Sequence, residues 1–245
     1  MRRYPSYFLI IIVLFSCKTV YQSQAVAYTD YRINNNGIDS SIIKLLQPYA
    51  DSVNKSMNDV VAVSIIELEK KQPEGTLGNM MTDAMFAKAK QVYDMPIDAA
   101  FINNGGLRLP SIPPGKITRG KIFELAPFDN TIVIQKLSGK ILQQFLNHIS
   151  SKGGWPTAGC SWQIKDKNAV NVLLNGLPID ETMVYNIAMI DYVANGGDDC
   201  IMLKNISQIS KGFLLRDAIL EYLADFTKQG KTVSSKIEKR VTNAE

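Results

Sequence analysis

Histidine is nearly absent from this chain: His148 is the only one among 245 residues. Ser-His-Asp triads and Cys-His pairs need histidine beside other reactive groups, and a two-metal hydrolytic site needs several histidines or carboxylates that converge on the ions. The sequence also has no Asp-x-His or Gly-Asn-His-Asp segment. His148 falls near the end of a helical segment, where a single histidine is usually structural, so we expect no catalytic role for it. The composition argues against hydrolysis by this chain alone.

Concentrated charge is also lacking. The 27 Lys and Arg residues exceed the 23 Asp and Glu residues by four, and they are spread along the chain. Proteins that bind nucleic acid usually gather basic residues on one segment or face. We therefore expect no nucleic-acid partner. With 46% apolar and 20% charged residues, the chain resembles an ordinary globular protein that can bury a core.

Long apolar runs are missing too, since the run Tyr7–Phe15 is too short to cross a bilayer. It follows Arg2 and Arg3 and leads into the sequence LFSC, which ends at Cys17. This order is typical of a secretory signal, and a cysteine after a small residue resembles the bacterial lipobox. We expect residues 1–17 to be a lipoprotein signal peptide; a plain signal peptide or an uncleaved anchor are the alternatives. The chain would then be exported and held by lipid on Cys17 at the periplasmic side of a membrane or at the cell surface.

Cysteine is scarce, and only Cys160 and Cys200 follow Cys17. An exported chain meets an oxidising compartment, in which a disulfide between the two is allowed. Two separate, partly buried thiols are the interpretation that we favour.

The remaining organisation is simple. Residues 18–39 are polar and include the run NNNG, so they predict a tether. Residues 40–230 show no internal repeat and no clear linker, which favours one α+β domain with mixed strands. Residues 231–245 predict a charged tail in solvent.

Several elements can be placed within this domain. Thr76 is a candidate N-cap for a helix over Thr76–Tyr93, whose methionine stripe would pack in the core. Thr118 is a candidate cap for a helix over Arg119–Leu125. We expect the last helix to cover Phe213–Phe226.

Two glycine-bearing loops attract attention. The first, NNGGLR over Asn103–Arg108, follows an apolar strand; its glycines would let the backbone approach a ligand, while Asn and Arg supply donors. Taken alone, it is more simply a tight connection before several prolines. The second loop covers Asp191–Asp199 and holds Tyr192, paired glycines and two aspartates.

Six segments together resemble, in order and spacing, the C-terminal domain of the 5′-nucleotidase family, which includes bacterial periplasmic UDP-sugar hydrolases and animal ecto-5′-nucleotidases. The resemblance covers roughly residues 60–226 and implies an α+β fold, a four-layer α/β/β/α sandwich with mixed sheets. The segments are LGNMMTDAM (Leu77–Met85), NNGGLR (Asn103–Arg108), GKIT (Gly115–Thr118), APFDN (Ala126–Asn130), LSGKIL (Leu137–Leu142) and DYVANGGDD (Asp191–Asp199).

The resemblance also implies a binding site for a nucleotide or nucleoside. Phe128 and Tyr192 would sandwich the base, an interaction of about 1–3 kcal/mol that tolerates different bases. Arg108 would contact the phosphate or ribose side, and Asp198 the ribose hydroxyls. The full predicted set is Asn103, Gly105, Gly106, Arg108, Phe128, Asn130, Tyr192, Gly196, Gly197 and Asp198.

Two departures from the family pattern matter. The family usually carries an arginine shortly before the segment equivalent to Glu74–Asn79, whereas this chain has Lys70 and Lys71, so a phosphate contact is missing or is made by a lysine. The family's hydrolysis is done by an N-terminal metallophosphoesterase domain with two metals and a catalytic histidine, and we recognise no such segment in this sequence. We therefore expect no cofactor in this chain and divalent metals only in a partner.

Three functional hypotheses follow from this comparison. The chain supplies substrate binding to a separately encoded metallophosphatase in nucleotide hydrolysis. Alternatively, it captures nucleosides or nucleotides at the cell surface without chemistry. In the third, it is a degenerate structural or interaction protein that keeps the fold without the pocket.

Overall fold

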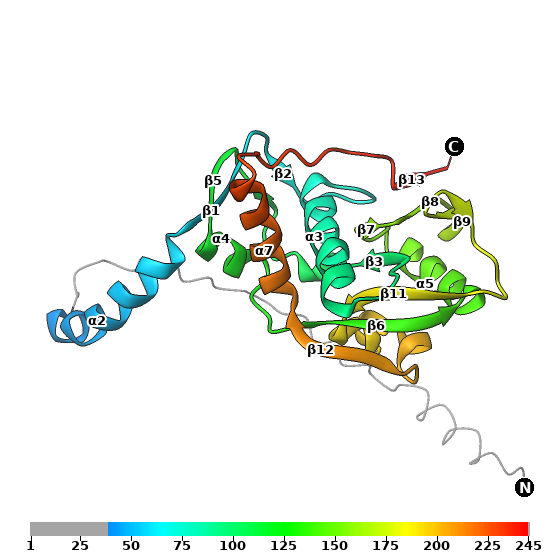
Figure 1. Cartoon of the computed structure of the whole chain (residues 1–245), viewed down its shortest axis with the longest axis horizontal. Coiled ribbons are helices and arrows are strands. Elements are labelled where there is room, and N and C mark those ends of the chain that lie inside the picture. Colours follow the sequence, from blue (N-terminus) through cyan, green and yellow to red (C-terminus); the bar gives the residue numbers. More distant parts are fainter. Residues whose placement is uncertain (1–38, 245) are drawn as a thin grey trace, which may run out of the picture. The chain divides into compact units, whose positions relative to one another are not determined.

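The structure is a computed structural model that describes residues 39–244 (Figure 1). The expected signal peptide, the lipidation site Cys17 and residues 18–38 of the expected tether lie outside the described residues. These residues fall into two compact units, with the boundary between Leu46 and Gln47 inside helix α2 (Ser40–Met57). None of the α2 residues is buried. Within residues 39–244, every helix is too short or too polar to cross a membrane.

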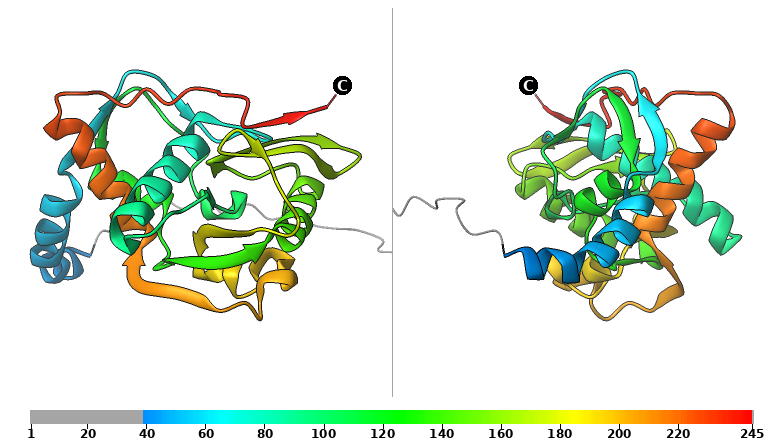
Figure 2. Two further views of the ribbon diagram at one scale, coloured as in Figure 1. Left: turned by 45° about the vertical axis from the view of Figure 1, so that its right-hand side comes forward. Right: turned by 90° about the vertical axis from the view of Figure 1, so that its left-hand side faces the viewer.

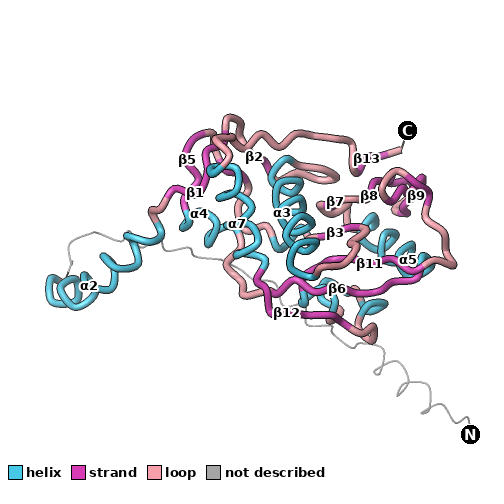
Figure 3. Tube along the Cα trace, viewed as in Figure 1, coloured by secondary structure: helices cyan, strands magenta, loops and turns pink. Residues whose placement is uncertain are grey.

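The second unit holds all the elements after α2 (Figure 3). In chain order they are β1 (Val60–Ser64), β2 (Leu68–Glu69), α3 (Thr76–Tyr93), β3 (Ala99–Phe101), η1 (Asn104–Gly106), β4 (Ser111–Ile112), β5 (Gly115–Thr118), α4 (Arg119–Leu125), β6 (Thr131–Ser138), α5 (Gly139–Ser151), β7 (Thr157–Ala158), β8 (Cys160–Lys165), β9 (Asn168–Leu174), β10 (Leu177–Pro178), β11 (Val184–Ile190), α6 (Asp191–Ala194), η2 (Gly197–Asp199), η3 (Ile201–Leu203), β12 (Gln208–Leu214), α7 (Leu215–Lys228) and β13 (Val241–Asn243).

A five-stranded sheet of order β12-β6-β11-β3-β7 forms the centre of this unit. Strand β11 runs antiparallel to β6 and parallel to β3, so the sheet is mixed. Ile132, Val133 and Ile134 of β6 are all buried, a continuous apolar run typical of a strand covered on both faces. Helix α3 contacts β3 and β7, and α6 contacts β6. The predicted fold class, α+β with mixed sheets, is confirmed.

A second sheet has the order β10-β9-β8-β13. In the left view of Figure 2, its red C-terminal strand lies beside the yellow-green strands. Its last strand corrects an expectation, because residues 231–244, the described part of the expected charged tail, are not a free tail. Val233 and Val241 are each 2% exposed, and Val241 pairs with Trp162 of β8 in parallel register. The edge of β8 offers unpaired backbone groups that β13 satisfies, and Arg240 donates to both carboxylate oxygens of Asp83.

Helix α3 shows where local sequence rules succeed and fail. Met80, Met81 and Met85 are buried in the core, as the methionine stripe predicted. The predicted Thr76 cap is wrong: the N-cap residue is Gly75, which has no side chain to make a capping bond. Thr76 Oγ1 instead accepts from the backbone N–H of Glu69 at 2.8 Å. The Thr76 hydroxyl is therefore bound to the end of strand β2 and does not cap the helix.

The region before the last helix also differs from the prediction. Residues 208–214 form strand β12 against β6, and helix α7 begins only at Leu215. Ile209 pairs with Ile134, and the register shifts before Leu214. A pairing partner that lies far away in the sequence therefore overrides the helical spacing of Phe213 and Leu214. By contrast, Thr118 caps α4 as predicted, accepting from Lys121 N at 3.2 Å.

Candidate functional site

Three loops of the second unit enclose one pocket of about 330 Å³. Its lining contains eight of the ten residues that the sequence predicted, together with Ile190. Gly196 and Gly197 lie in the same loop as Tyr192 but outside the lining. The pocket is lined by Asn103, Gly105, Gly106, Arg108, Phe128, Asn130, Ile190, Tyr192 and Asp198.

The order of strands in the central sheet explains why these loops meet. The Asn103 loop (residues 103–108) follows β3, and the Tyr192 loop (residues 191–199) follows β11. Because β3 and β11 are parallel neighbours, both loops leave the same edge of the sheet. Strand β6 is antiparallel to β11 and starts at that edge, which brings the Phe128 loop (residues 126–130) beside them.

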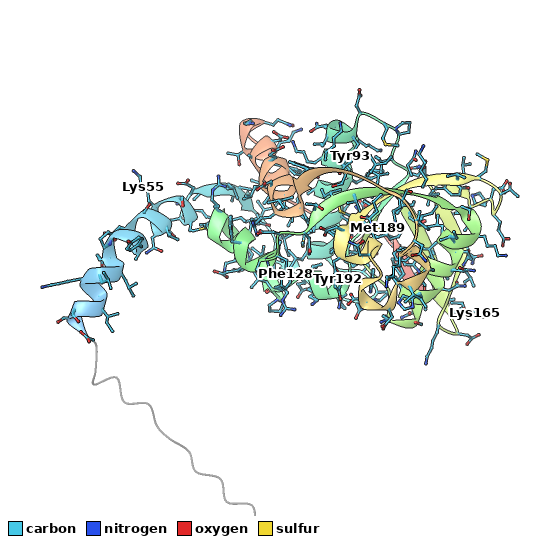
Figure 4. All side chains as sticks on the ribbon, turned by 90° about the horizontal axis from the view of Figure 1, so that it is seen from below. Lys55, Tyr93, Phe128, Lys165, Met189 and Tyr192 are labelled. Carbon is cyan, nitrogen blue, oxygen red and sulfur yellow. The ribbon has the colours of Figure 1, made fainter. Side chains whose placement is uncertain are left out.

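Phe128 and Tyr192 supply two aromatic rings to the pocket, one from each of two loops (Figure 4). Their side chains are 50% and 46% exposed, unlike the buried aromatic residues of the core. Large half-exposed rings that line one pocket are typical of a binding surface. The Arg108 guanidinium lies 5.7 Å from the centre of the Phe128 ring, within cation–π range.

The Phe128 loop is anchored by Arg216 of helix α7, a residue that sequence reasoning missed. Its guanidinium donates to the carbonyl oxygens of Ala126 and Phe128, at 3.2 and 3.4 Å, and to Asp129 Oδ1 at 2.6 Å. Its carbon Cζ lies 4.2 Å from the centre of the Phe123 ring. Arg216 is only 8% exposed, so one buried cation positions the backbone that carries Phe128.

The Tyr192 loop is anchored mainly through Asp198. The Tyr192 hydroxyl donates to Asp198 Oδ1 at 3.0 Å and accepts from the Asp198 backbone N–H at 3.2 Å. The second carboxylate oxygen, Oδ2, accepts from Asn103 Nδ2 at 2.7 Å. Asp198 has a φ of 50°, in the left-handed region that few non-glycine residues adopt. These contacts join the Asn103 loop to the Tyr192 loop.

Two glycines are needed here because neighbouring groups come very close. A Cβ atom on Gly197 would lie 2.5 Å from the Tyr192 ring, and one on Gly106 would lie 2.7 Å from Asn103 Oδ1. Gly197 therefore acts by letting the ring lie against the backbone, which explains its place behind the lining.

The end of helix α5 adds two supports that sequence reasoning also missed. His148 Nε2 lies 2.8 Å from the carbonyl oxygen of Asp198, and Lys152 Nζ lies 2.9 Å from Asp199 Oδ2. The hydrogen bond from Lys152 holds the pKa of the Asp199 carboxyl below its usual value. The same bond raises the pKa of Lys152. In this arrangement His148 contacts the backbone of the loop, while its ring is not part of the pocket lining.

Lys70, one of the lysines in place of the family arginine, contacts the Asn103 loop. Its ammonium donates to the carbonyl oxygen of Leu107 at 2.9 Å, next to Arg108 in the chain. Lys70 is absent from the pocket lining. It therefore supports the loop from behind and adds positive charge near Arg108.

Both cysteines that the structure describes are free and buried, so the favoured interpretation of two separate thiols is confirmed. Burial raises the pKa of Cys200 to about 12, and burial also raises the pKa of Cys160. Both groups stay protonated at neutral pH, and a thiol without thiolate character is a poor nucleophile.

Metal ligands do not gather in the described part of the chain. Within residues 39–244, no three His, Cys, Asp or Glu side chains lie close enough together to hold a metal ion. These residues do not fit a two-metal hydrolytic centre, which needs several such ligands around each ion. What the pocket offers is two aromatic faces, a carboxylate and a guanidinium.

Comparison with known proteins places the chain in a family. A family model described as "5'-nucleotidase, C-terminal domain" matches residues 53–205. The protein UshA of Yersinia enterocolitica is 27% identical over 194 residues, which cover 76% of this chain and 34% of UshA. The trifunctional nucleotide phosphoesterase protein YfkN of Bacillus subtilis is 31% identical over 190 residues, which cover 69% of this chain and 12% of YfkN. The chain thus spans about a third of UshA and less of YfkN.

Solved structures agree with this. A 5'-nucleotidase precursor from Thermus thermophilus aligns with a TM-score of 0.73 and 28% identity, over 84% of this chain and 44% of that one. The NAD nucleotidase of Haemophilus influenzae shares the fold, with a TM-score of 0.63 and 17% identity over 84% of this chain and 42% of its own. Since the family model covers more than half of the sequence, the chain belongs to the 5'-nucleotidase C-terminal domain family.

Proposed function

We propose that this chain binds nucleotides or nucleosides in the pocket and supplies substrate binding for nucleotide hydrolysis by a metallophosphatase on a separate chain. The observation that carries the proposal is the placement of two half-exposed rings, Phe128 and Tyr192, in one pocket with Arg108 and Asp198. Family membership supports it, because the matching proteins bear nucleotidase names.

The proposed binding mode assigns a task to each group. The base stacks between Phe128 and Tyr192, at about 1–3 kcal/mol per stacked face. Each oxygen of the Asp198 carboxylate already accepts one protein donor, and an ionised carboxylate has room for about four, so both can still accept from ribose hydroxyls. Arg108 offers the planar donor set that matches a phosphate group, with Lys70 nearby as a second positive charge.

Phosphate cleavage is assigned to the partner. The donor set of this chain, with one histidine and no cluster of metal ligands among residues 39–244, does not fit a two-metal site. The chain's own residues hold and orient the substrate, and the metallophosphatase would present its metals to the phosphate. In the family that the sequence resembles, substrate binding belongs to the C-terminal domain and hydrolysis to the N-terminal metallophosphoesterase domain.

Binding and hydrolysis assays separate this proposal from its alternatives. Calorimetric titration with adenosine and AMP should show binding by the purified chain, with no release of phosphate. Addition of a metallophosphatase from the same organism should then start AMP hydrolysis. Binding that never leads to hydrolysis with any such partner would favour a nucleoside-capturing surface protein instead. Absence of binding would leave only a structural or interaction role.

We also propose that the chain is exported and anchored through lipid on Cys17. The basis is the sequence pattern of residues 1–17 alone. Growth with a labelled fatty acid should label the native protein and not a C17A variant. Equal labelling of both proteins would overturn this proposal.

A further inference from the structure

The hydroxyl of Tyr192 does something that stacking does not require. Its ring alone provides the aromatic face, yet the hydroxyl makes two hydrogen bonds with Asp198, one to the carboxylate and one from the backbone N–H. These bonds close a seven-residue loop on itself between positions 192 and 198. The Gly197 backbone lies against the ring at the same place, where a Cβ would come within 2.5 Å of ring carbons.

We propose that the Tyr192 hydroxyl is a positioning group that holds the Asp198 carboxylate toward the ligand and so makes the site selective for a ribose that carries its 2′ and 3′ hydroxyls. This inference rests on the proposed function. It gives Tyr192 two separate tasks: the ring stacks on the base, and the hydroxyl aims a neighbouring carboxylate.

The backbone of Asp198 explains why such a positioning group is needed. Asp198 and Asp199 both have positive φ angles, 50° and 62°, in the left-handed region that non-glycine residues seldom adopt. A residue in that region returns to ordinary conformations unless its surroundings hold it. The Tyr192 hydroxyl binds both the backbone and the side chain of Asp198, so it stabilises the conformation and the carboxylate direction together.

Asn103 alone does not replace this contact. It donates one bond to Oδ2 of Asp198 from a different loop, leaving the carboxylate free to rotate about that single bond. With Tyr192 on Oδ1 and Asn103 on Oδ2, both oxygens are held, and each keeps room to accept a further donor in the pocket that Asp198 lines. The amide orientation is consistent with this arrangement, because Asn103 Oδ1 turned toward the carboxylate would repel it.

The test compares two ligands that differ only in the ribose hydroxyls. Adenosine and 2′,3′-dideoxyadenosine are titrated into the wild-type chain and into Y192F, which keeps the ring and removes the hydroxyl. Y192F should lower the affinity for adenosine by roughly three- to tenfold, the worth of a lost hydrogen bond. The affinity for the dideoxy compound should change by less than about twofold, since stacking is kept.

A second variant and a matched control make the result specific. In a D198A background, Y192F should have no further effect on adenosine, because the group that it positions is gone. Y185F is the control: Tyr185 OH also accepts from an aspartate backbone N–H, that of Asp180 at 2.8 Å, but at the opposite end of strand β11. Y185F should leave both affinities unchanged.

Three outcomes would overturn the inference. One is an equal loss for both ligands in Y192F, which would mean that the hydroxyl affects stacking or folding. Another is an undiminished effect of Y192F in the D198A background. If the wild-type chain binds neither ligand, the proposed function itself fails, and this result is distinct from binding that ignores the Tyr192 hydroxyl.

Discussion

The two aromatic walls of the pocket are held in different ways. Phe128 has no polar group of its own, and its loop depends on Arg216, which lies 88 residues further along the chain. Tyr192 is held by its own hydroxyl within the same loop, and Asn103, His148 and Lys152 add contacts from two other elements. Backbone bonds hold the two ends of the Phe128 loop, from Ala126 N to Ile122 O and from Leu215 N to Asn130 O, both at 2.9 Å. Among the described residues, side-chain hydrogen bonds to this loop come from Arg216 alone, whereas several side chains support the Tyr192 loop.

This difference predicts how each wall responds to mutation. Loss of the buried Arg216 side chain, which donates to two backbone carbonyls, leaves both carbonyls without that partner, and this is costly. Loss of one contact among several leaves the remaining contacts in place. We therefore expect one substitution, at Arg216, to destabilise the Phe128 loop strongly. Each single substitution around the Tyr192 loop should destabilise that loop less.

The largest effect is expected from R216A. It removes the donor to the Ala126 and Phe128 carbonyls and leaves Asp129 without its ion pair. The free energy of unfolding should fall by about 2–4 kcal/mol, measured by denaturant titration. The R216K variant keeps the positive charge but lacks the planar set of donors, so its free energy of unfolding should lie between those of wild type and R216A. An R216A protein as stable as wild type would show that Arg216 is not the anchor.

The ring substitutions come next and compare the walls directly. F128A removes one stacking face, so nucleoside binding should weaken by about 1–3 kcal/mol. Y192A should weaken it further, because Asp198 also loses a hydrogen-bond partner. Calorimetry gives both values, and F128L offers a matched apolar control without an aromatic face. A larger loss of nucleoside affinity in F128A than in Y192A would contradict the expected difference between the two loops.

A smaller effect concerns acid and the Lys152–Asp199 contact. The pKa of Asp199 is lowered in the folded chain, chiefly by the Lys152 hydrogen bond, so its ionised form stabilises the fold above the ordinary carboxyl range. This contribution disappears as the pH falls through the lowered pKa. The stability difference between wild type and K152M should thus be present near neutral pH, vanish in strong acid and shrink with salt. Unfolding curves at several pH values measure it; a difference that persists unchanged in strong acid would contradict the assignment.

The smallest effect expected is the reactivity of Cys200, the thiol beside the Tyr192 loop. Burial raises its pKa to about 12, so the thiolate is scarce at neutral pH. Iodoacetamide should leave Cys200 unmodified in the folded chain and modify it in denaturant, as peptide mass spectra would show. Rapid modification of the native chain would mean that this side of the loop opens readily.

What could be predicted from the sequence depended on whether the partner group was near in the chain. Thr118 caps helix α4 as predicted, because the group that it binds, the backbone N–H of Lys121, lies only three residues away. Thr76 looked equally suited to capping, but a strand end elsewhere binds its hydroxyl. A pattern within the helix does not show a competing group outside it, here the backbone N–H of Glu69, seven residues before Thr76.

The residues of the candidate site also differ in how far they could be predicted from the sequence. The residues that the family resemblance named mostly line one pocket, because motif order and spacing carry information about loops that meet in space. Arg216 and His148 were missed, since each acts on the backbone of a loop 50 or more positions away and has no motif of its own. Val241 was missed for a similar reason: its burial depends on the free edge of β8.

The most direct test of the central claim is a crystal structure of this chain with adenosine. We predict that the base lies between the rings of Phe128 and Tyr192, with the ribose hydroxyls directed toward the Asp198 carboxylate. A base bound elsewhere on the chain, or an empty pocket at saturating adenosine, would contradict the claim.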